Sequence, residues 1–179
     1  YIFDSDDTLE ILHDMGGYDV LDLSNSSRDN SFIYLSNTTA RGYFEVGDVS
    51  LHWNGDEHNT SRVITLSTKT QIEKFIGGPG DETVSVGSTT DNVSTGSGSD
   101  TVYLIGVYKS LKDIQVDLGS DNDTAQVILD YEQNEVNNLI NINGGTGYDK
   151  LLVLFLQEAT VDLTIYEEHF DGFEFYIFA

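Results

Sequence analysis

A nine-residue repeat limits the folds open to this chain more than any other feature of its sequence. Residues 77–103 divide into three consecutive units, GGPGDETVS, VGSTTDNVS and TGSGSDTVY, each with an acid at the sixth place and Val at the eighth. The three acids are Glu82, Asp91 and Asp100. A short period of this kind indicates stacked units of secondary structure that bury a core together with their neighbours.

Further copies of the unit lie on both sides of this tract. They read DMGGYDVLD at residues 14–22, LGSDNDTAQ at residues 118–126 and GGTGYDKLL at residues 144–152. The acids at their sixth places are Asp19, Asp123 and Asp149. Because these copies combine the same residue types, we expect them to form the same local structure.

Each unit has a direct physical interpretation. Glycine at the second and fourth places permits a positive φ and close backbone approach, so the first six residues form a tight turn whose carbonyl groups converge. The last three residues form a short strand whose middle apolar side chain faces inward. Two units complete one circuit of a flattened coil. This arrangement stacks the turn of Glu82 on the turn of Asp100 and puts Asp91 on the opposite edge.

The remaining sequence also favours β-structure. Apolar and polar residues alternate at residues 114–118, 125–129 and 161–165, which is typical of half-buried strands. An unbroken apolar run at residues 151–156 predicts a strand that is covered on both faces or that caps one end of the stack. We therefore predict an all-β fold, a parallel β-roll with flanking and inserted β-strands, in a single domain over residues 1–179.

The charge of the chain indicates that its partner is a cation. Lys plus Arg number 8 against 31 Asp plus Glu, and the formal net charge of −23 opposes any compact state. Nucleic acids and anionic membranes need a basic face, which excludes both as partners. No apolar run approaches the roughly 18 residues of a membrane span. Because there is no Cys, oxygen atoms are the abundant ligands, and these favour calcium.

Calcium completes the predicted architecture as a calcium-stapled β-solenoid. The ion takes about 6 to 8 oxygen ligands, and two stacked turns supply two carboxylates and several backbone carbonyls. The candidate ligands are Gly78, Gly80, Glu82, Asp91, Thr95, Gly96, Ser97, Gly98, Asp100, Gly119, Asp121, Asp123, Gly145, Gly147 and Asp149. Such a fold suits the outside of a cell, where free calcium is abundant.

The repeat resembles the glycine- and aspartate-rich nonapeptide GGxGxDxUx of RTX proteins, a calcium-binding β-helix repeat. TGSGSDTVY at residues 95–103 lacks only the first Gly of that motif. Two more segments, HDMGGYDVLDLS at residues 13–24 and TQIEKFIGGPGDE at residues 70–82, are similar to the C-terminal β-roll domain of serralysin-type secreted metalloproteases. The likeness is good over residues 14–103 and weak over residues 117–152.

The resemblance implies a further calcium site. In that family a D-x-G-G-x-D turn and a T-x-E segment share one calcium, so the implied ligands are Asp14, Gly16, Gly17, Asp19, Gln71 and Glu73. Gln71 stands where the family has Thr. The resemblance also implies a secreted, extracellular protein of the bacterial type that uses type I secretion. Its parent chain would carry a catalytic or adhesive domain.

The sequence departs from the family pattern at several places. Glu82 stands where Asp is usual, the unit at residues 86–94 keeps one Gly, and Asp121 replaces the second Gly of its unit. Calcium positions that use the middle turn are therefore expected to be weak or empty. The H-E-x-x-H zinc helix of the family's proteolytic centre is missing, so we expect a non-catalytic module and no enzyme.

Other interpretations of the same residues stay open. Gly, Asp, Asn and Ser are common in solvated loops, although such loops do not keep a nine-residue period. A pair of acids could serve a carboxylate-based hydrolase. The stretches at residues 45–62 and 104–117 could bind sugar or another cell in an adhesin, and Trp53 fits a small apolar cluster better than a sugar site. We expect residues 170–179 to form a final strand that closes the stack.

Overall fold

The computed structural model describes the repeat tracts and the strands beside them. The described residues are 9–12, 17–25, 31–35, 63–66, 72–86, 90–105, 114–129, 140–155 and 170–178. Within these ranges every helix or strand is a β-strand, which confirms the prediction of an all-β chain. The same ranges contain no helix long and apolar enough to cross a membrane.

The described part of the chain forms fourteen short strands. In chain order they are β1 (Leu9–Leu12), β2 (Val20–Asp22), β3 (Ser31–Tyr34), β4 (Val63–Leu66), β5 (Lys74–Ile76), β6 (Glu82–Ser85), β7 (Asn92–Ser94), β8 (Thr101–Ile105), β9 (Ile114–Asp117), β10 (Thr124–Leu129), β11 (Ile140–Asn143), β12 (Lys150–Phe155), β13 (Phe170–Asp171) and β14 (Phe175–Phe178). The strands are short because turns rich in Gly and Asp interrupt each apolar stretch after a few residues.

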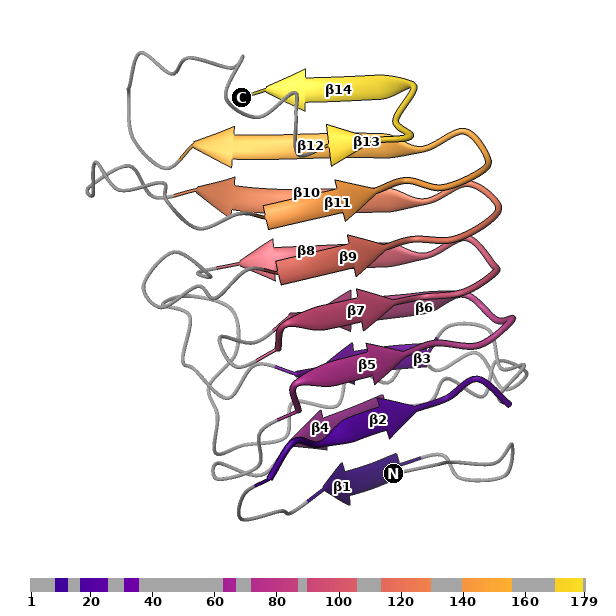
Figure 1. The fold of residues 1–179 in the computed structure, drawn as a ribbon, viewed down its shortest axis with the longest axis vertical. Coiled ribbons are helices and arrows are strands. Elements are labelled where there is room, and N and C mark those ends of the chain that lie inside the picture. The colour runs from indigo at the N-terminus through magenta and orange to yellow at the C-terminus, as the bar shows by residue number, and fades with distance from the viewer. Residues whose placement is uncertain are drawn as a thin grey trace, which may run out of the picture.

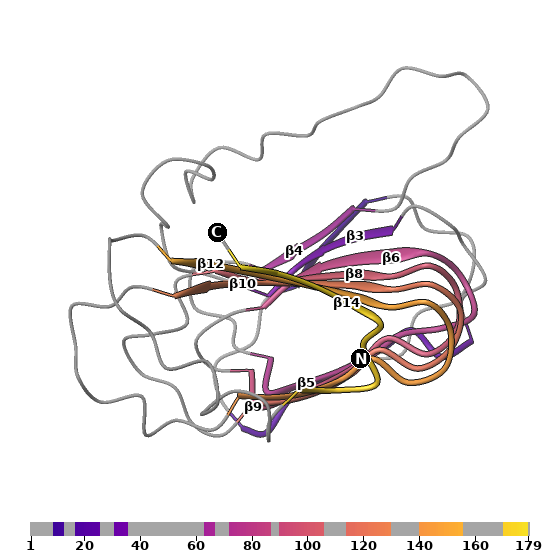
Figure 2. The same cartoon turned by 90° about the horizontal axis from the view of Figure 1, so that it is seen from above.

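These strands form two sheets whose described pairings are all parallel. The eight-stranded sheet has the order β1-β4-β3-β6-β8-β10-β12-β14, and the six-stranded sheet has the order β13-β11-β9-β7-β5-β2. From β5 to β14 the chain alternates between the sheets (Figure 1). Seen from above, the sheets face each other and a series of turns crosses between them at one edge (Figure 2).

The core lies between the sheets, and each sheet contributes an inward column of side chains in register. The column of the eight-stranded sheet consists of Val84, Val102, Ala125 and Leu151. The column of the six-stranded sheet consists of Leu21, Phe75, Val93, Val116 and Ile142. None of these residues is more than 4% exposed. Six of them stand at the eighth place of their nine-residue units, where the repeat predicts an inward residue, whereas Phe75, Val116 and Ile142 lie outside every unit.

Strand β12 differs from the prediction made for its apolar run. Leu151 and Val153 are buried, whereas Leu152 and Leu154 on the other face are only partly buried. The strand therefore turns one face to the core, and it does not end the stack because β14 pairs along its other side. The final strand expected near the C-terminal end is present as β14. The strand expected at residues 161–165 lies outside the described residues.

The N-terminal strands interrupt the alternation. Strands β3 and β4 follow each other along the chain, yet they lie in the same sheet, where β4 sits between β1 and β3. Strand β3 pairs on its other side with β6. No nine-residue unit covers residues 23–66, so the repeat could not predict this exchange of order. The stretch at residues 45–62, including Trp53, lies outside the described residues.

Candidate metal centre

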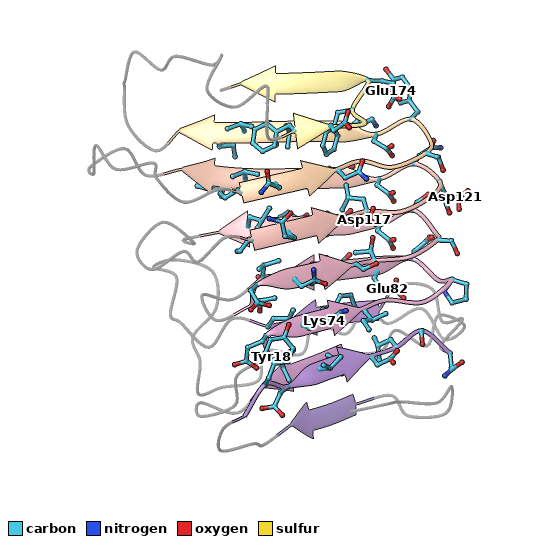
Figure 3. The ribbon with its side chains drawn as sticks, in the orientation of Figure 1. Tyr18, Lys74, Glu82, Asp117, Asp121 and Glu174 are labelled. Carbon is cyan, nitrogen blue, oxygen red and sulfur yellow. The ribbon has the colours of Figure 1, made fainter. Side chains whose placement is uncertain are left out.

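The turns rich in glycine lie along one edge of the two sheets, which we call the glycine edge. They comprise residues 77–82, 95–100, 118–123, 144–149 and 171–174, and each leads from the six-stranded sheet to the eight-stranded sheet. Glu82, Asp121 and Glu174 mark this edge in Figure 3. Because the strands on both sides are parallel and in register, equivalent residues of successive turns lie one above the other.

One acid from each turn belongs to a continuous column along this edge. The acid column consists of Glu82, Asp100, Asp123, Asp149 and Glu174. Each carboxylate after Glu82 accepts a hydrogen bond from the backbone N–H of the acid in the preceding turn. The four N···O distances, taken in that order, are 2.8, 2.7, 2.8 and 2.6 Å. The predicted stacking of Glu82 and Asp100 is therefore confirmed.

Four members of the acid column are hidden from solvent. Glu82, Asp100 and Asp123 are 1% exposed, and Asp149 is 0% exposed. Both carboxylate oxygens of Glu82, and Oδ2 of the three aspartates, are buried without a hydrogen-bond partner in the described part of the chain. Burying an ionised carboxylate costs several kcal/mol unless a counter-charge and hydrogen bonds offset the lost hydration. These oxygens therefore favour a positively charged ligand.

Burial changes the acid–base behaviour of the column. Loss of hydration and the nearby charge of Asp100 raise the pKa of Glu82 to about 9. Burial also raises the pKa of Asp100 to about 6 and the pKa of Asp123 to about 7, and it shifts the pKa of Asp149 upward. Desolvation is the main cause in each case, and neighbouring acids add to it. Without a cation, the folded column therefore holds protons near neutral pH.

The junction between two successive turns brings carboxylates and a carbonyl together. A Cβ atom on Gly77 would collide with the carbonyl oxygen of Thr95 and would lie 2.9 Å from Glu82 Oε2. Asp100, from the turn that contains Thr95, reaches the backbone N–H of Glu82. This junction therefore offers two carboxylates and a backbone carbonyl. These are the oxygen donors that hard divalent cations bind.

Glycine is required where the turns approach most closely. Gly119 has a φ of +92°, and a Cβ atom there would collide with the carbonyl oxygen of Gly96. A side chain at position 119 would therefore have both a strained backbone and a clash with the preceding turn, residues 95–100. The glycines predicted to line the turns all lie at this edge: Gly78, Gly80, Gly96, Gly98, Gly119, Gly145 and Gly147.

Two acids outside the acid column tie neighbouring turns together. Ser99 N donates a hydrogen bond to Asp81 Oδ1 at 2.7 Å. Gly98 N donates one to Asp121 Oδ2 at 3.2 Å. Asp121 has a φ of +86° in the place of a glycine, and its side chain is exposed on the outer rim of the turns (Figure 3). This predicted ligand is therefore apart from the buried column.

Thr95 and Ser97 connect the turn at residues 95–100 to the turns on either side of it. The buried Thr95 donates a hydrogen bond through Oγ1 to Leu118 O at 2.7 Å. Ser97 N donates one to Gly78 O at 3.0 Å. Both predicted ligand residues thus already use polar atoms to hold the turns in register.

A second, shorter set of acids lies on the opposite edge. Asp19, Glu73 and Asp91 each come directly before a strand of the six-stranded sheet, at equivalent places in the register. Asp19 N donates a hydrogen bond to Glu73 Oε2 at 2.7 Å, and Tyr18 Oη donates one to Asp91 Oδ1 at 3.2 Å. The structure thus brings Asp19 and Glu73 together across more than fifty residues, and it places Asp91 on this edge as expected.

Of the other four residues in the site implied by the resemblance, the structure describes only Gly17. Gly17 lies two residues before Asp19 with a φ of +136°, and a Cβ atom there would be in ordinary van der Waals contact with the Asp19 carboxylate oxygens. Asp14, Gly16 and Gln71 lie outside the described residues. That all six implied ligands meet at one point therefore remains a prediction from the sequence.

Within the described ranges, no single point gathers three or more His, Cys, Asp or Glu side chains. The acid column explains this, because its acids stand in single file with one from each turn. A cation at a junction would have to take its remaining ligands from backbone carbonyls. Comparisons of the chain with protein-family models, curated proteins and solved structures found no match.

Glu174 is the member of the acid column that the repeat did not reveal. Its turn reads DGFE, which does not fill a nine-residue unit. A weaker signal was present, because Gly172 precedes the acid by two residues and an apolar strand, β14, follows it directly. A search for the order glycine, acid and apolar strand, without a fixed length, would have found it.

Proposed function

We propose that this chain is a calcium-binding β-roll module of the RTX type, in which calcium ions at the junctions of the glycine edge staple a β-solenoid. The observation that carries the proposal is the set of buried carboxylate oxygens without hydrogen-bond partners in the described acid column. The module is non-catalytic and extracellular. It belongs to a larger secreted protein whose other domains carry the catalytic or adhesive activity.

The acid column fits a calcium ligand set by its chemistry. It supplies only oxygen atoms, and it supplies them as carboxylates beside backbone carbonyls, as calcium prefers. When bound, calcium supplies the positive charge that the buried carboxylates lack. The glycines let neighbouring turns approach, and the hydrogen bonds along the column hold each carboxylate at its junction.

Calcium binding and folding of the glycine edge are then a single event. The chain carries a net charge of −23, and folding brings the acids of the column into one line. A cation that binds only the folded state adds about 2.7 kcal/mol per site at a hundredfold excess over its Kd. Several sites in one column are enough to decide whether the edge folds.

The contact between Asp19 and Glu73 supports the serralysin-type part of the proposal. A calcium shared by the Asp19 turn and the Glu73 segment would fasten β2 to β5 at the opposite edge, beside their pairing in the six-stranded sheet. In that proposal Asp14, Gly16, Gly17 and Gln71 supply the remaining oxygens.

The proposal is tested by calcium titration of the metal-free protein, followed by circular dichroism. We expect weak β-structure in excess chelator and a cooperative gain of β-structure on addition of calcium, with a much smaller gain in equimolar magnesium. Asp100→Asn should raise the calcium concentration at the midpoint at least tenfold. The matched control is Asp117→Asn, which changes an exposed acid at the end of β9 and should leave the midpoint in place. An unchanged β spectrum and melting temperature in excess chelator would contradict coupled folding.

A further inference from the structure

The last turn of the glycine edge, residues 171–174, is shorter than the others, yet it packs on its neighbour in the same way. Gly144 N donates a hydrogen bond to Asp171 O at 2.7 Å, and Glu174 N donates one to Asp149 O at 3.1 Å. The pairing of Lys150 with Phe175 puts Glu174 beside Asp149 in the register that each earlier acid keeps with its own predecessor, although in the earlier turns the residue after the acid makes the second bond. Figure 3 shows Glu174 at the end of the row of turns.

The donor groups at this last junction match those at the first. A Cβ atom on Gly144 would collide with the carbonyl oxygen of Gly172 and would lie 3.0 Å from Cβ of Asp149. Cβ of Asp149 and the carbonyl oxygen of Gly172 therefore both lie beside Gly144. The carboxylate of Glu174 reaches the backbone N–H of Asp149 at 2.6 Å. Gly77 at the first junction is likewise approached by a carbonyl of the next turn, and there the nearby atom of its own turn's acid is a carboxylate oxygen.

Asp149 has a buried carboxylate oxygen without a partner in the described part of the chain, and a cation at this junction could contact it. Its side chain is 0% exposed, Oδ1 accepts the N–H of Asp123, and Oδ2 has no hydrogen-bond partner among the described residues. The neighbouring Glu174 is exposed, so a cation arriving from solvent can reach its carboxylate directly.

We infer that Glu174 is a metal ligand and that residues 171–174 are a shortened but working repeat. Together with the Asp149 carboxylate and the Gly172 carbonyl, Glu174 completes a calcium site at the last junction. This inference rests on the proposed function, because it adds one site to the same column.

The substitution Glu174→Gln tests this assignment in the full chain. Glutamine keeps an oxygen that can accept the Asp149 N–H, but it removes the charge. The variant and the unaltered protein are first brought to the same circular dichroism spectrum at saturating calcium, and bound calcium is then counted by equilibrium dialysis. We expect the variant to bind one calcium fewer, or to bind one at least tenfold less tightly.

The matched control is Asp171→Asn in the same turn. Asp171 is also exposed, and its carboxylate accepts only a local hydrogen bond from Gly172 N at 2.9 Å among the interactions described here. This variant should bind the full number of calcium ions. A structural cap at position 174 would leave the count at saturating calcium unchanged, so the count separates a ligand from a cap.

Three outcomes distinguish this inference from the proposed function. A full calcium count in Glu174→Gln, beside a reduced count in Asp149→Asn, overturns the inference and leaves the proposed function intact. An unaltered protein that binds no calcium overturns both. If Glu174→Gln does not reach the reference spectrum, the unaltered protein still decides: a paramagnetic lanthanide must broaden the amide signals of Gly172 and Glu174 as it broadens that of Asp100, and sharp signals at Gly172 and Glu174 overturn the inference.

Discussion

The two edges of the sheets place acids at equivalent positions, but they surround those acids differently. On the glycine edge, Asp100 and Asp123 are buried, and the column continues to Glu174. On the opposite edge, Asp19, Glu73 and Asp91 are all partly exposed. Beyond Asp91 the register continues with two buried apolar residues, Ile114 and Ile140, so the run of acids stops there.

Under the proposed function, this difference predicts that burial, more than the number of acids, decides which edge binds a cation. A partly exposed carboxylate keeps much of its hydration, and its interactions with other charges are weak. A buried carboxylate loses that hydration and must take up a proton or a counter-charge. The glycines are the cause of the burial, because they let the turns close around their own acids. The following predictions test this contrast, beginning with the largest effect.

The stability of the metal-free protein should fall steeply as the pH rises. The pKa of Glu82 is about 9 and the pKa of Asp123 is about 7 in the folded state, against ordinary values near 4 in the unfolded chain. The folded state therefore binds more protons between about pH 4 and pH 9, and this stabilisation is lost as the pH rises through that window. Each pKa unit is worth about 1.4 kcal/mol per group, so the loss from pH 5 to pH 8 should reach several kcal/mol. A pH titration in chelator, followed by circular dichroism, measures it: β-structure present at pH 5 should be largely lost by pH 8.

Calcium should remove this dependence, because calcium ligands must be deprotonated. In excess calcium the protein should be at least as stable at pH 8 as at pH 5. Asp123→Asn should flatten the pH profile of the metal-free protein, whereas Asp91→Asn on the opposite edge should leave it unchanged. A profile that Asp91→Asn flattens equally would remove the contrast between the edges.

Removal of one acid should cost far more on the glycine edge than on the opposite edge. Asp100→Ala should destabilise the calcium-loaded protein by about 3 to 5 kcal/mol, because it leaves a buried site without its charge partner. Asp91→Ala should cost less than about 1 kcal/mol, because the side chain is partly exposed. Chemical denaturation in excess calcium compares the two. Equal losses would mean that burial is not the deciding factor.

Glycine substitutions should show the same contrast through sterics. Gly119→Ala should cost about 2 to 4 kcal/mol, from a strained positive φ and from the clash with the Gly96 carbonyl. Gly17 on the opposite edge also has a positive φ, but the Asp19 carboxylate oxygens would lie 3.8 and 3.9 Å from a new Cβ there, which is ordinary van der Waals contact. The cost of Gly17→Ala should therefore stay near the strain alone, about 1 to 2 kcal/mol. Thermal melts in calcium measure both, and a Gly17 variant as damaged as the Gly119 variant would argue against close stacking.

The smallest expected effect concerns the hydrogen bond from Asp19 N to the Glu73 carboxylate. In chelator at pH 5, where no calcium contributes, Glu73→Ala removes the carboxylate that accepts the Asp19 N–H, and it should cost about 0.5 to 1.5 kcal/mol. Hydrogen exchange of the Asp19 amide should become several times faster. The Asp149 amide, whose acceptor is on the glycine edge, serves as the internal control and should exchange as before.

The repeat predicted those parts of the molecule that depend only on its period. It placed Glu82 beneath Asp100 and Asp91 across from them, because two nine-residue units make one circuit. It missed Glu174, whose turn is too short for a unit, and it missed the place of β4 between β1 and β3, where no repeat exists. The repeat also could not predict that Oδ2 of Asp123 is buried, because this burial depends on contacts with turns more than twenty residues away in the sequence.

The hydrogen bonds of the acid column have a consequence for how such a chain can lengthen. Successive acids of the column are 18, 23, 26 and 25 residues apart in sequence, yet the bonds that join them all measure between 2.6 and 2.8 Å. The distance between neighbouring turns of the glycine edge is thus independent of the number of residues that separate them in the sequence. The extra residues lie in the sequence between a strand of the eight-stranded sheet and the next strand of the six-stranded sheet, and closing a longer loop costs little, roughly 0.6 kcal/mol for each doubling of its length. Evolution, or protein design, can therefore change the length of the connections between strands while the turns of the glycine edge keep a constant spacing.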